Sequence, residues 1–170
     1  MTALLLPTNE LVACAYLIAA VPGLTPAMVG TGLPQKVESW YQTGFVQVSS
    51  VVGGTPDAYV PLNNPVVSVK CWGVNLKQTQ NTSGQTVYSV TEKPPWQITA
   101  QLPERIRNAL RASTGAGAAA RTVAMAPNGF AHATVHSAYM LTEPKRGLGD
   151  LGSYACFQFE LYLKWTPQET

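Results

Sequence analysis

Residues 154–165 read YACFQFELYLKW and alternate between apolar and more polar side chains. A period of two is typical of a strand that buries one face of a sheet. The apolar set is Ala155, Phe157, Phe159, Leu161, Leu163 and Trp165, and the opposite set is Cys156, Gln158, Glu160, Tyr162 and Lys164. We therefore predict an antiparallel sheet with one buried face and a second face that is wet or contacts a partner.

Further strands are predicted upstream of this stretch. Residues 65–74, PVVSVKCWGV, alternate so that Val67, Val69 and Cys71 face the core. Segments 37–54, 121–126 and 130–141 also predict strands, the first perhaps bent at Gly44. The expected core faces are Val46, Val48 and Val52 in one strand, and Ala131, Ala133, Val135, Tyr139 and Leu141 in another.

Two helices are expected. The apolar run 11–21 follows Thr8-Asn9-Glu10, which offers a cap, and stops at Pro22-Gly23. It is apolar on nearly every side and should be buried on more than one. The second helix lies within residues 96–112, where Leu102, Ile106 and Leu110 form a stripe, and Pro103 either kinks it or starts it.

The element order predicts a single domain over residues 1–170. The predicted order is a helix, a strand pair, a second helix and a second strand pair. This order predicts an α+β fold with a single-layer sheet of four or five mostly antiparallel strands and two helices packed on one face. Residues 76–92 are polar around Ser83-Gly84 and predict a protruding loop or small hairpin. Residues 142–153 predict a flexible loop.

Composition narrows the function classes. Charged residues are 12% of the chain, against about 25% in typical soluble domains, which favours a protein that assembles. The net charge is +2 and the basic residues are scattered, so duplex DNA is an unlikely main ligand. The run 11–21 is shorter than the roughly 20 residues of a membrane span and lacks the basic flank of a signal peptide.

No residue cluster points to catalysis, to a metal or to a cofactor. The cysteines Cys14, Cys71 and Cys156 are odd in number and form no CxxC, which favours a reducing cytoplasm, and Cys71 is expected to fill the core. His132 and His136 would lie roughly 13 Å apart on a strand, too far to share one metal. The stretch GLGDLG (147–152) has the spacing GxGxxG but is not placed between a strand and a helix. GxxxxGK[ST] and GxSxG are absent, so we expect no enzyme.

Four segments, in order, resemble the tail terminator proteins of long-tailed (siphovirus-type) actinobacteriophages. They are KCWGVN (70–75), KPPWQITAQLPERIRNAL (93–110), TEPKRGLGD (142–150) and YACFQFELYLKW (154–165). The shared features are a strand ending at Trp72-Gly73, a helix led by Pro95-Trp96, a loop with Pro144, Lys145, Arg146 and Asp150, and the alternating last strand. The resemblance follows the element order over roughly residues 8–165, and the 76–92 segment is longer than the family's usual link.

The resemblance implies a structural virion protein of the viral tail that is assembled in the host cytoplasm. In that family a homohexameric ring on the head-proximal end of the tail tube ends tube polymerisation and presents a surface to the head-completion (connector) protein. Genomic DNA passes through the lumen without sequence-specific binding. The candidate partner or lumen contacts are Lys145, Arg146, Asp150, Gln158, Glu160 and Lys164, and the candidate packing anchors are Trp72, Trp96 and Trp165.

Two alternatives stay open. The chain can be another virion component, either a head–tail joining protein or a tail-tube protein, although tube subunits are usually richer in strands. It can also be a small-molecule binding module built around Trp72 and Trp96, since large aromatics line many apolar pockets.

Overall fold

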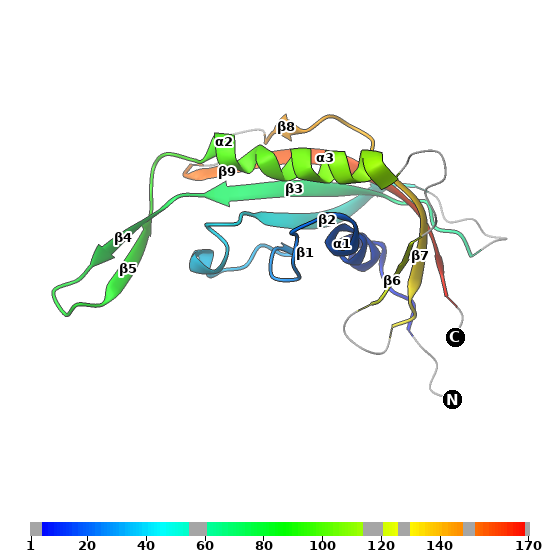
Figure 1. The fold of residues 1–170 in the computed structure, drawn as a ribbon, viewed down its shortest axis with the longest axis horizontal. Helices are drawn as coiled ribbons and strands as arrows, with labels where there is room; N and C mark the ends of the chain where they lie inside the picture. The colour runs from blue at the N-terminus through cyan, green and yellow to red at the C-terminus, as the bar shows by residue number, and fades with distance from the viewer. Residues whose placement is uncertain (1–4, 55–60, 114–120, 126–129, 148–151, 169–170) are drawn as a thin grey trace.

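The computed structural model describes residues 5–54, 61–113, 121–125, 130–147 and 152–168. Their fold is α+β, with helices packed against a curled and mostly antiparallel sheet (Figure 1). The helices are α1 (Asn9–Ala20), α2 (Trp96–Thr99) and α3 (Gln101–Ser113), with a short 3₁₀ turn η1 (Val37–Ser39). The class agrees with the expectation from the sequence, but the sheet has more strands than the four or five predicted.

The main sheet has seven strands among the described residues. They are β1 (Val29–Gly30), β2 (Phe45–Gly53), β3 (Val66–Val74), β6 (Arg121–Val123), β7 (Ala133–Met140), β8 (Lys145–Arg146) and β9 (Tyr154–Pro167). The order is β1-β2-β3-β9-β7-β6, β8 pairs with β9, and β1 runs parallel to β2. The extra strands β1 and β8 have two residues each, which is too short to show an alternation in the sequence.

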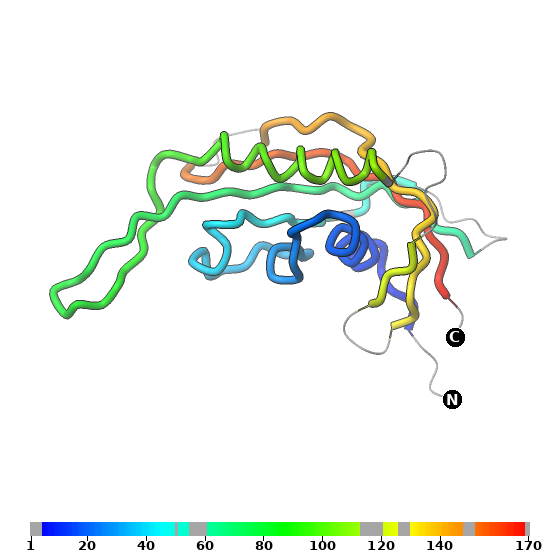
Figure 2. Tube along the Cα trace, in the orientation of Figure 1, coloured from blue at the N-terminus to red at the C-terminus, as the bar shows by residue number. Residues whose placement is uncertain are grey.

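A separate hairpin projects from the main sheet. Strands β4 (Leu76–Gln80) and β5 (Thr86–Val90) pair with each other, and the chain trace carries them away from the body of the molecule (Figure 2). The Asn81 side chain accepts the N–H groups of Ser83 and Gln85, at 3.0 and 2.8 Å, and orders the turn. Gly84 supplies the positive φ, +73°, that the turn requires. The 76–92 segment is therefore a hairpin.

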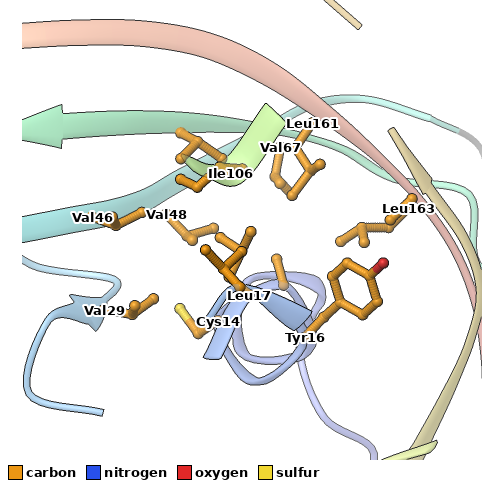
Figure 3. Close-up of a cluster of buried hydrophobic side chains, with 14 of the residues drawn as sticks. Cys14, Tyr16, Leu17, Val29, Val46, Val48, Val67, Ile106, Leu161 and Leu163 are labelled. Atoms are coloured by element: carbon orange, nitrogen blue, oxygen red, sulfur yellow. The ribbon is translucent and has the colours of Figure 1, made fainter. Parts of the chain in front are cut away.

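The three helices all lie on one face of the sheet. Ile106 of α3 and Leu17 of α1 meet Val46, Val48, Val67 and Leu161 in one buried cluster (Figure 3). Each of these side chains is 0% exposed. The helices therefore cover the face that the alternation in β3 and β9 predicted as apolar.

Helix α1 begins and ends close to the predicted run. The Thr8 hydroxyl caps it by accepting the N–H of Leu11 at 3.4 Å, and the helix stops at Ala20, before Pro22. Val12, Ala13, Cys14, Tyr16 and Leu17 are buried. The helix contacts β1, β2, β3, β6 and α3, which explains an apolar composition on most of its surface.

Pro103 decides where the second helical segment breaks. The chain forms two helices, α2 and α3, separated at Ala100, and Pro103 lies in the first turn of α3. A proline has no N–H for the carbonyl four residues earlier, and its ring crowds that carbonyl, here Thr99. Because Thr99 ends α2, the proline costs no helical hydrogen bond. The predicted alternative in which a new helix starts near Pro103 is the closer description.

Bulges overturn two of the predicted core faces. In β7 the pairing shifts between Val135 and Ser137, so Ala138 and Met140 turn towards the helices, whereas Tyr139 is 43% exposed. The prediction that Tyr139 and Leu141 face the core was therefore wrong, since one extra residue inverts the alternation.

The same happens in β2. The pairing is irregular after Val48, and Val52 is 51% exposed instead of sharing the buried face of Val46 and Val48. Strand β2 also starts only at Phe45, after Gly44, whose φ is +71°. The first part of the predicted 37–54 strand forms η1 instead.

Candidate functional site

The face of the sheet opposite the helices carries most of the sequence-predicted contact residues. We call it the open face and define it by Gln47, Ser49, Ser68, Lys70, Trp72, Tyr139, Lys145, Gln158, Glu160, Tyr162 and Lys164. Strand register places these side chains on one side of β2, β3, β7, β8 and β9. Most of these side chains are polar, as the alternation of β9 predicts. At the Trp72 end, however, the face packs against a second buried cluster, formed by Trp40, Phe45 and Val74.

Hydrogen bonds between strands order this face. The Ser49 hydroxyl donates to the carbonyl of Ser68 at 3.1 Å, and the Gln158 amide donates to the Ser68 hydroxyl at 3.2 Å. The Trp72 indole N–H donates to the Gln47 side-chain oxygen at 2.9 Å. Ser68 is 4% exposed, yet its hydroxyl is satisfied. The open face is therefore held rigid by side chains before any partner arrives.

Aromatic rings extend the open face towards β7. Tyr139 and Tyr162 stack with ring centroids 4.7 Å apart, and the Tyr162 hydroxyl donates to Asn64 at 3.1 Å. Tyr139 and the neighbouring Leu141 are about half exposed. This end of the face offers apolar area next to polar groups, a mixture common in protein interfaces.

Lys145, Gln158 and Glu160 come together at a hollow of about 480 Å³ on the open face. Lys145 lies directly opposite Gln158 in the β8–β9 pair. The Thr142 hydroxyl accepts the Glu160 N–H at 2.9 Å and closes one side of the hollow. Lys164 lies farther along the same face of β9. Four of the six predicted contact residues therefore share one surface.

Arg146 points to the other side of the sheet. It pairs with Phe157, and its guanidinium carbon lies 4.8 Å from the centre of the Trp96 ring. Trp96 in turn meets Phe157 edge-on, with centroids 5.8 Å apart. Lys145 and Arg146 both border the hollow, but successive strand residues alternate, so Lys145 lies opposite Gln158 whereas Arg146 lies opposite Phe157 and over Trp96. Asp150 lies outside the described residues.

The three candidate tryptophan anchors lie in separate places. Trp72 is half-buried on the open face, edge-on to Tyr154 at 6.4 Å, whereas Trp96 lies under Arg146 on the helix side. Trp165 is 3% exposed, and its indole N–H donates to the Asn9 side chain at 2.9 Å. Trp72 and Trp96 are therefore not positioned to form one ligand platform.

The three thiols are buried and held in the protonated form. Burial raises the pKa of Cys14 to about 11, with a smaller contribution from Glu10. Burial also raises the pKa of Cys156 to about 11, opposed by Lys70, and raises the pKa of Cys71 still further. Cys156 lies on the predicted polar face, opposite Trp72, but it is only 2% exposed there. A thiol with so high a pKa is a poor nucleophile near neutral pH.

The histidines are not arranged as ligands of a common metal. His136 is exposed on β7 and shares a hydrogen bond of 3.0 Å with the Thr166 hydroxyl. Within the described part of the chain, no group of three or more His, Cys, Asp or Glu side chains could hold a metal ion.

An apolar groove next to α1 was not anticipated from the sequence. Its volume is about 500 Å³, and Leu11, Cys14, Ala15, Ile18, Val123 and Met125 form most of its wall. The sequence does contain the apolar stripe that lines the groove, at spacing i, i+4 and i+7 in α1. Because nearly every residue of this run is apolar, however, the sequence does not show which side of the helix stays uncovered. A hollow of about 460 Å³ adjoins it and is lined by both polar and apolar residues: Thr8, Glu10, Leu11, Thr31, Val48 and Ser49.

The helices of the described residues are too short or too polar to cross a membrane. Scans with models of known protein families and against curated proteins find no match to this chain.

Proposed function

We propose that this chain is a structural virion protein of the tail terminator type. Six copies would form a ring at the head-proximal end of a phage tail tube, end its polymerisation and provide the surface for head attachment. The partners are then a second copy of the chain, the tube protein and the head-completion protein, with genomic DNA passing through the lumen.

One observation supports this proposal most strongly. The four segments that carry the resemblance are far apart in sequence but converge in space. Helix α2 packs on β3 and β9, and a Cβ on Gly73 would meet the Thr99 hydroxyl at 1.9 Å. Strand β8 pairs with β9, and Arg146 lies over Trp96 of α2. The described residues of these segments therefore form one connected structural unit, which supports a common role for them.

The shape of the molecule also fits an assembling protein. The open face is polar and pre-ordered, and a hairpin projects beyond the main sheet (Figure 1). A closed ring needs two different surfaces on each copy that fit one another. The open face, the hairpin and the α1 groove are three distinct candidates for such contacts.

Electron microscopy and solution mass test the proposal directly. Purified protein, alone or mixed with tubes assembled from the cognate tube protein, should give rings with a central hole or caps at one tube end. Caps at both ends, or incorporation along the tube, would instead indicate a joining or tube protein. A monomer that leaves the tubes unaltered would contradict the proposal.

A small-molecule binding module is the second candidate, because of the α1 groove. Its apolar lining and volume of about 500 Å³ lie in the range of ligand pockets. A monomer whose melting temperature rises with an apolar ligand such as a fatty acid would favour this alternative over a ring.

A further inference from the structure

We infer that the β4–β5 hairpin is an arm that docks into the α1 groove of a second copy of the chain. This deepens and rests on the proposed function, since it names the contact that would link neighbouring copies. The groove is the one described above, between α1, β1 and β6, together with the adjoining hollow at Glu10.

The hairpin makes few contacts with the rest of its own chain. Every residue from Lys77 to Val90 is exposed. Tyr88 meets Tyr41 with ring centroids 6.1 Å apart, which fixes one hairpin face towards its own molecule. A two-stranded hairpin is at best marginally stable in water, so a projecting one gains from a partner.

The opposite hairpin face is free and has a distinct pattern. Lys77 lies across from Ser89, and Thr79 lies across from Val87, so these four side chains share that face. From base to tip the order is the charged Lys77 beside Ser89, the apolar Val87 beside Thr79, and the polar turn at Asn81. Val87 is 44% exposed there.

The groove has the same order along α1. Glu10 and the hydroxyls of Thr8 and Thr31 lie at one end, and Leu11, Ala15 and Ile18 provide the apolar middle. At the far end Arg121 donates a hydrogen bond to the carbonyl of Ala19. Lys77 is the only charged residue of the hairpin, residues 76–90, and it would meet Glu10.

The lengths also agree. Nine residues of helix from Glu10 to Ala19 span about 13 Å at 1.5 Å per residue. Four strand residues from Lys77 to Asn81 span about 13 Å at 3.3 Å per residue. With Lys77 at Glu10, Val87 reaches the apolar middle and the polar turn reaches Arg121. Charge, polarity and length thus match in one orientation. Because the hairpin and the groove are different surfaces of one chain, each copy can link to a next one head to tail.

Cysteine cross-linking tests this contact. Cys14 is too deeply buried to react readily, so Ala15, which lines the groove and is only partly buried, provides the second thiol. Val87→Cys with Ala15→Cys should give a ladder of disulfide-linked oligomers in the full chain at pH 8.5 with an added oxidant. Val90→Cys with Ala15→Cys is the matched control, since Val90 has a similar exposure of 41% but lies on the opposite hairpin face. The ladder should disappear in the single variant Val87→Cys. No ladder from Val87→Cys with Ala15→Cys, or an equal one from the control, overturns the inference.

A charge exchange tests the orientation. Lys77→Glu and Glu10→Lys should each weaken self-association a few-fold in sedimentation, and the double variant should recover it. Circular dichroism checks that α1 still forms in Glu10→Lys, which places a cation near the helix N-terminus. If the double variant associates no more strongly than either single variant, the proposed orientation is overturned.

The Val87→Asp variant separates this inference from the proposed function. It should weaken association roughly tenfold or more, because a charge would enter the apolar middle of the groove. Rings that persist unchanged in Val87→Asp overturn the arm and leave the tail terminator proposal standing. Open filaments of the unaltered chain that Val87→Asp abolishes support the arm and contradict the closed ring.

Discussion

Lys145 and Arg146 show that a shift of one position along a strand changes which side chains a residue contacts. The two residues are neighbours in sequence and were expected to share one contact surface. Both border the hollow beside Gln158 and Glu160, but only Arg146 also lies over Trp96. A double charge reversal would therefore mix two effects, one on a surface and one on packing.

The two residues should be separable by single substitutions. Arg146→Glu should lower the free energy of unfolding by about 0.5–1 kcal/mol, because the cation–π contact with Trp96 is lost. Lys145→Glu should leave stability nearly unchanged and impair assembly with virion partners. Urea unfolding measures the first effect and particle yield the second. Normal particle yield in Lys145→Glu would argue against a partner at the open face.

At this scale the sequence predicted the buried positions of regular strands well. Alternation correctly placed Val67, Val69 and Cys71 in the core, each 0% exposed. It failed at Tyr139, because a bulge is a property of the pairing between two strands and leaves no mark in the composition of one. It placed Cys156 on the correct face, opposite Trp72, but polarity patterns do not report what covers a small side chain, so its burial was not foreseen.

The docking of α2 on β3 is the clearest constraint at the scale of elements. Helix α2 has four residues and depends on its neighbours for stability. It approaches β3 at Gly73, where a Cβ would come within 1.9 Å of the Thr99 hydroxyl and 3.2 Å of the Pro95 ring. The absence of a side chain at Gly73 is what allows this close approach.

Gly73→Ala should therefore displace α2 and lower the free energy of unfolding by about 1–3 kcal/mol. Gly53→Ala in β2 is the matched control, because its Cβ would meet Val66 at an ordinary 3.8 Å. Chemical denaturation of both variants measures the difference. Equal stability of the two variants would mean that α2 yields easily and does not anchor the Trp96–Arg146 cluster.

Among the elements, the long ones were predictable and the short ones were not. Helix α1 and strands β3 and β9 carry enough residues for a clear period and clear ends. Strands β1 and β8 have two residues each and exist because a neighbouring strand offers its edge. The break between α2 and α3 followed from proline chemistry, but its position at Ala100 required the structure.

For the whole molecule, the buried thiols predict a specific response to alkaline pH. The pKa values of Cys14 and Cys156 rise from 9.0 to about 11, and that of Cys71 rises further. The folded chain thus keeps protons that the unfolded chain releases above about pH 9. Below about pH 9 the burial of the thiols contributes fully to the free energy of unfolding. This contribution is lost progressively as the pH rises above about 9.

Urea unfolding between pH 7 and 11 should show this decline. Cys71→Ala should be less stable at pH 7 but should lose stability more slowly above pH 9, by about 1.4 kcal/mol per pH unit. Lysine and tyrosine titrations are common to both proteins and cancel in the comparison. Parallel pH profiles would mean that Cys71 ionises as readily in the folded chain as in the unfolded one.

The candidate surfaces were only partly predictable at this scale. The alternation of β9 predicted a polar face, and that face exists with its hydrogen bonds in place. The α1 groove depends on how α1, β1 and β6 approach one another in three dimensions, which no local pattern contains. The free face of the hairpin likewise follows from the contact between Tyr41 and Tyr88.

Strand β9 has a consequence for how the chain is made. Among the described strands it is the last in chain order, so it leaves the ribosome after β3, β7 and β8, yet it lies in the middle of the sheet and pairs with all three. Until it arrives, β3 and β7 have no common neighbour, and their unpaired edges stay exposed in a nascent chain. Translation must therefore run through residue 167 before the core can close, so messages truncated upstream should yield aggregates or proteolytic fragments in place of partly working subunits.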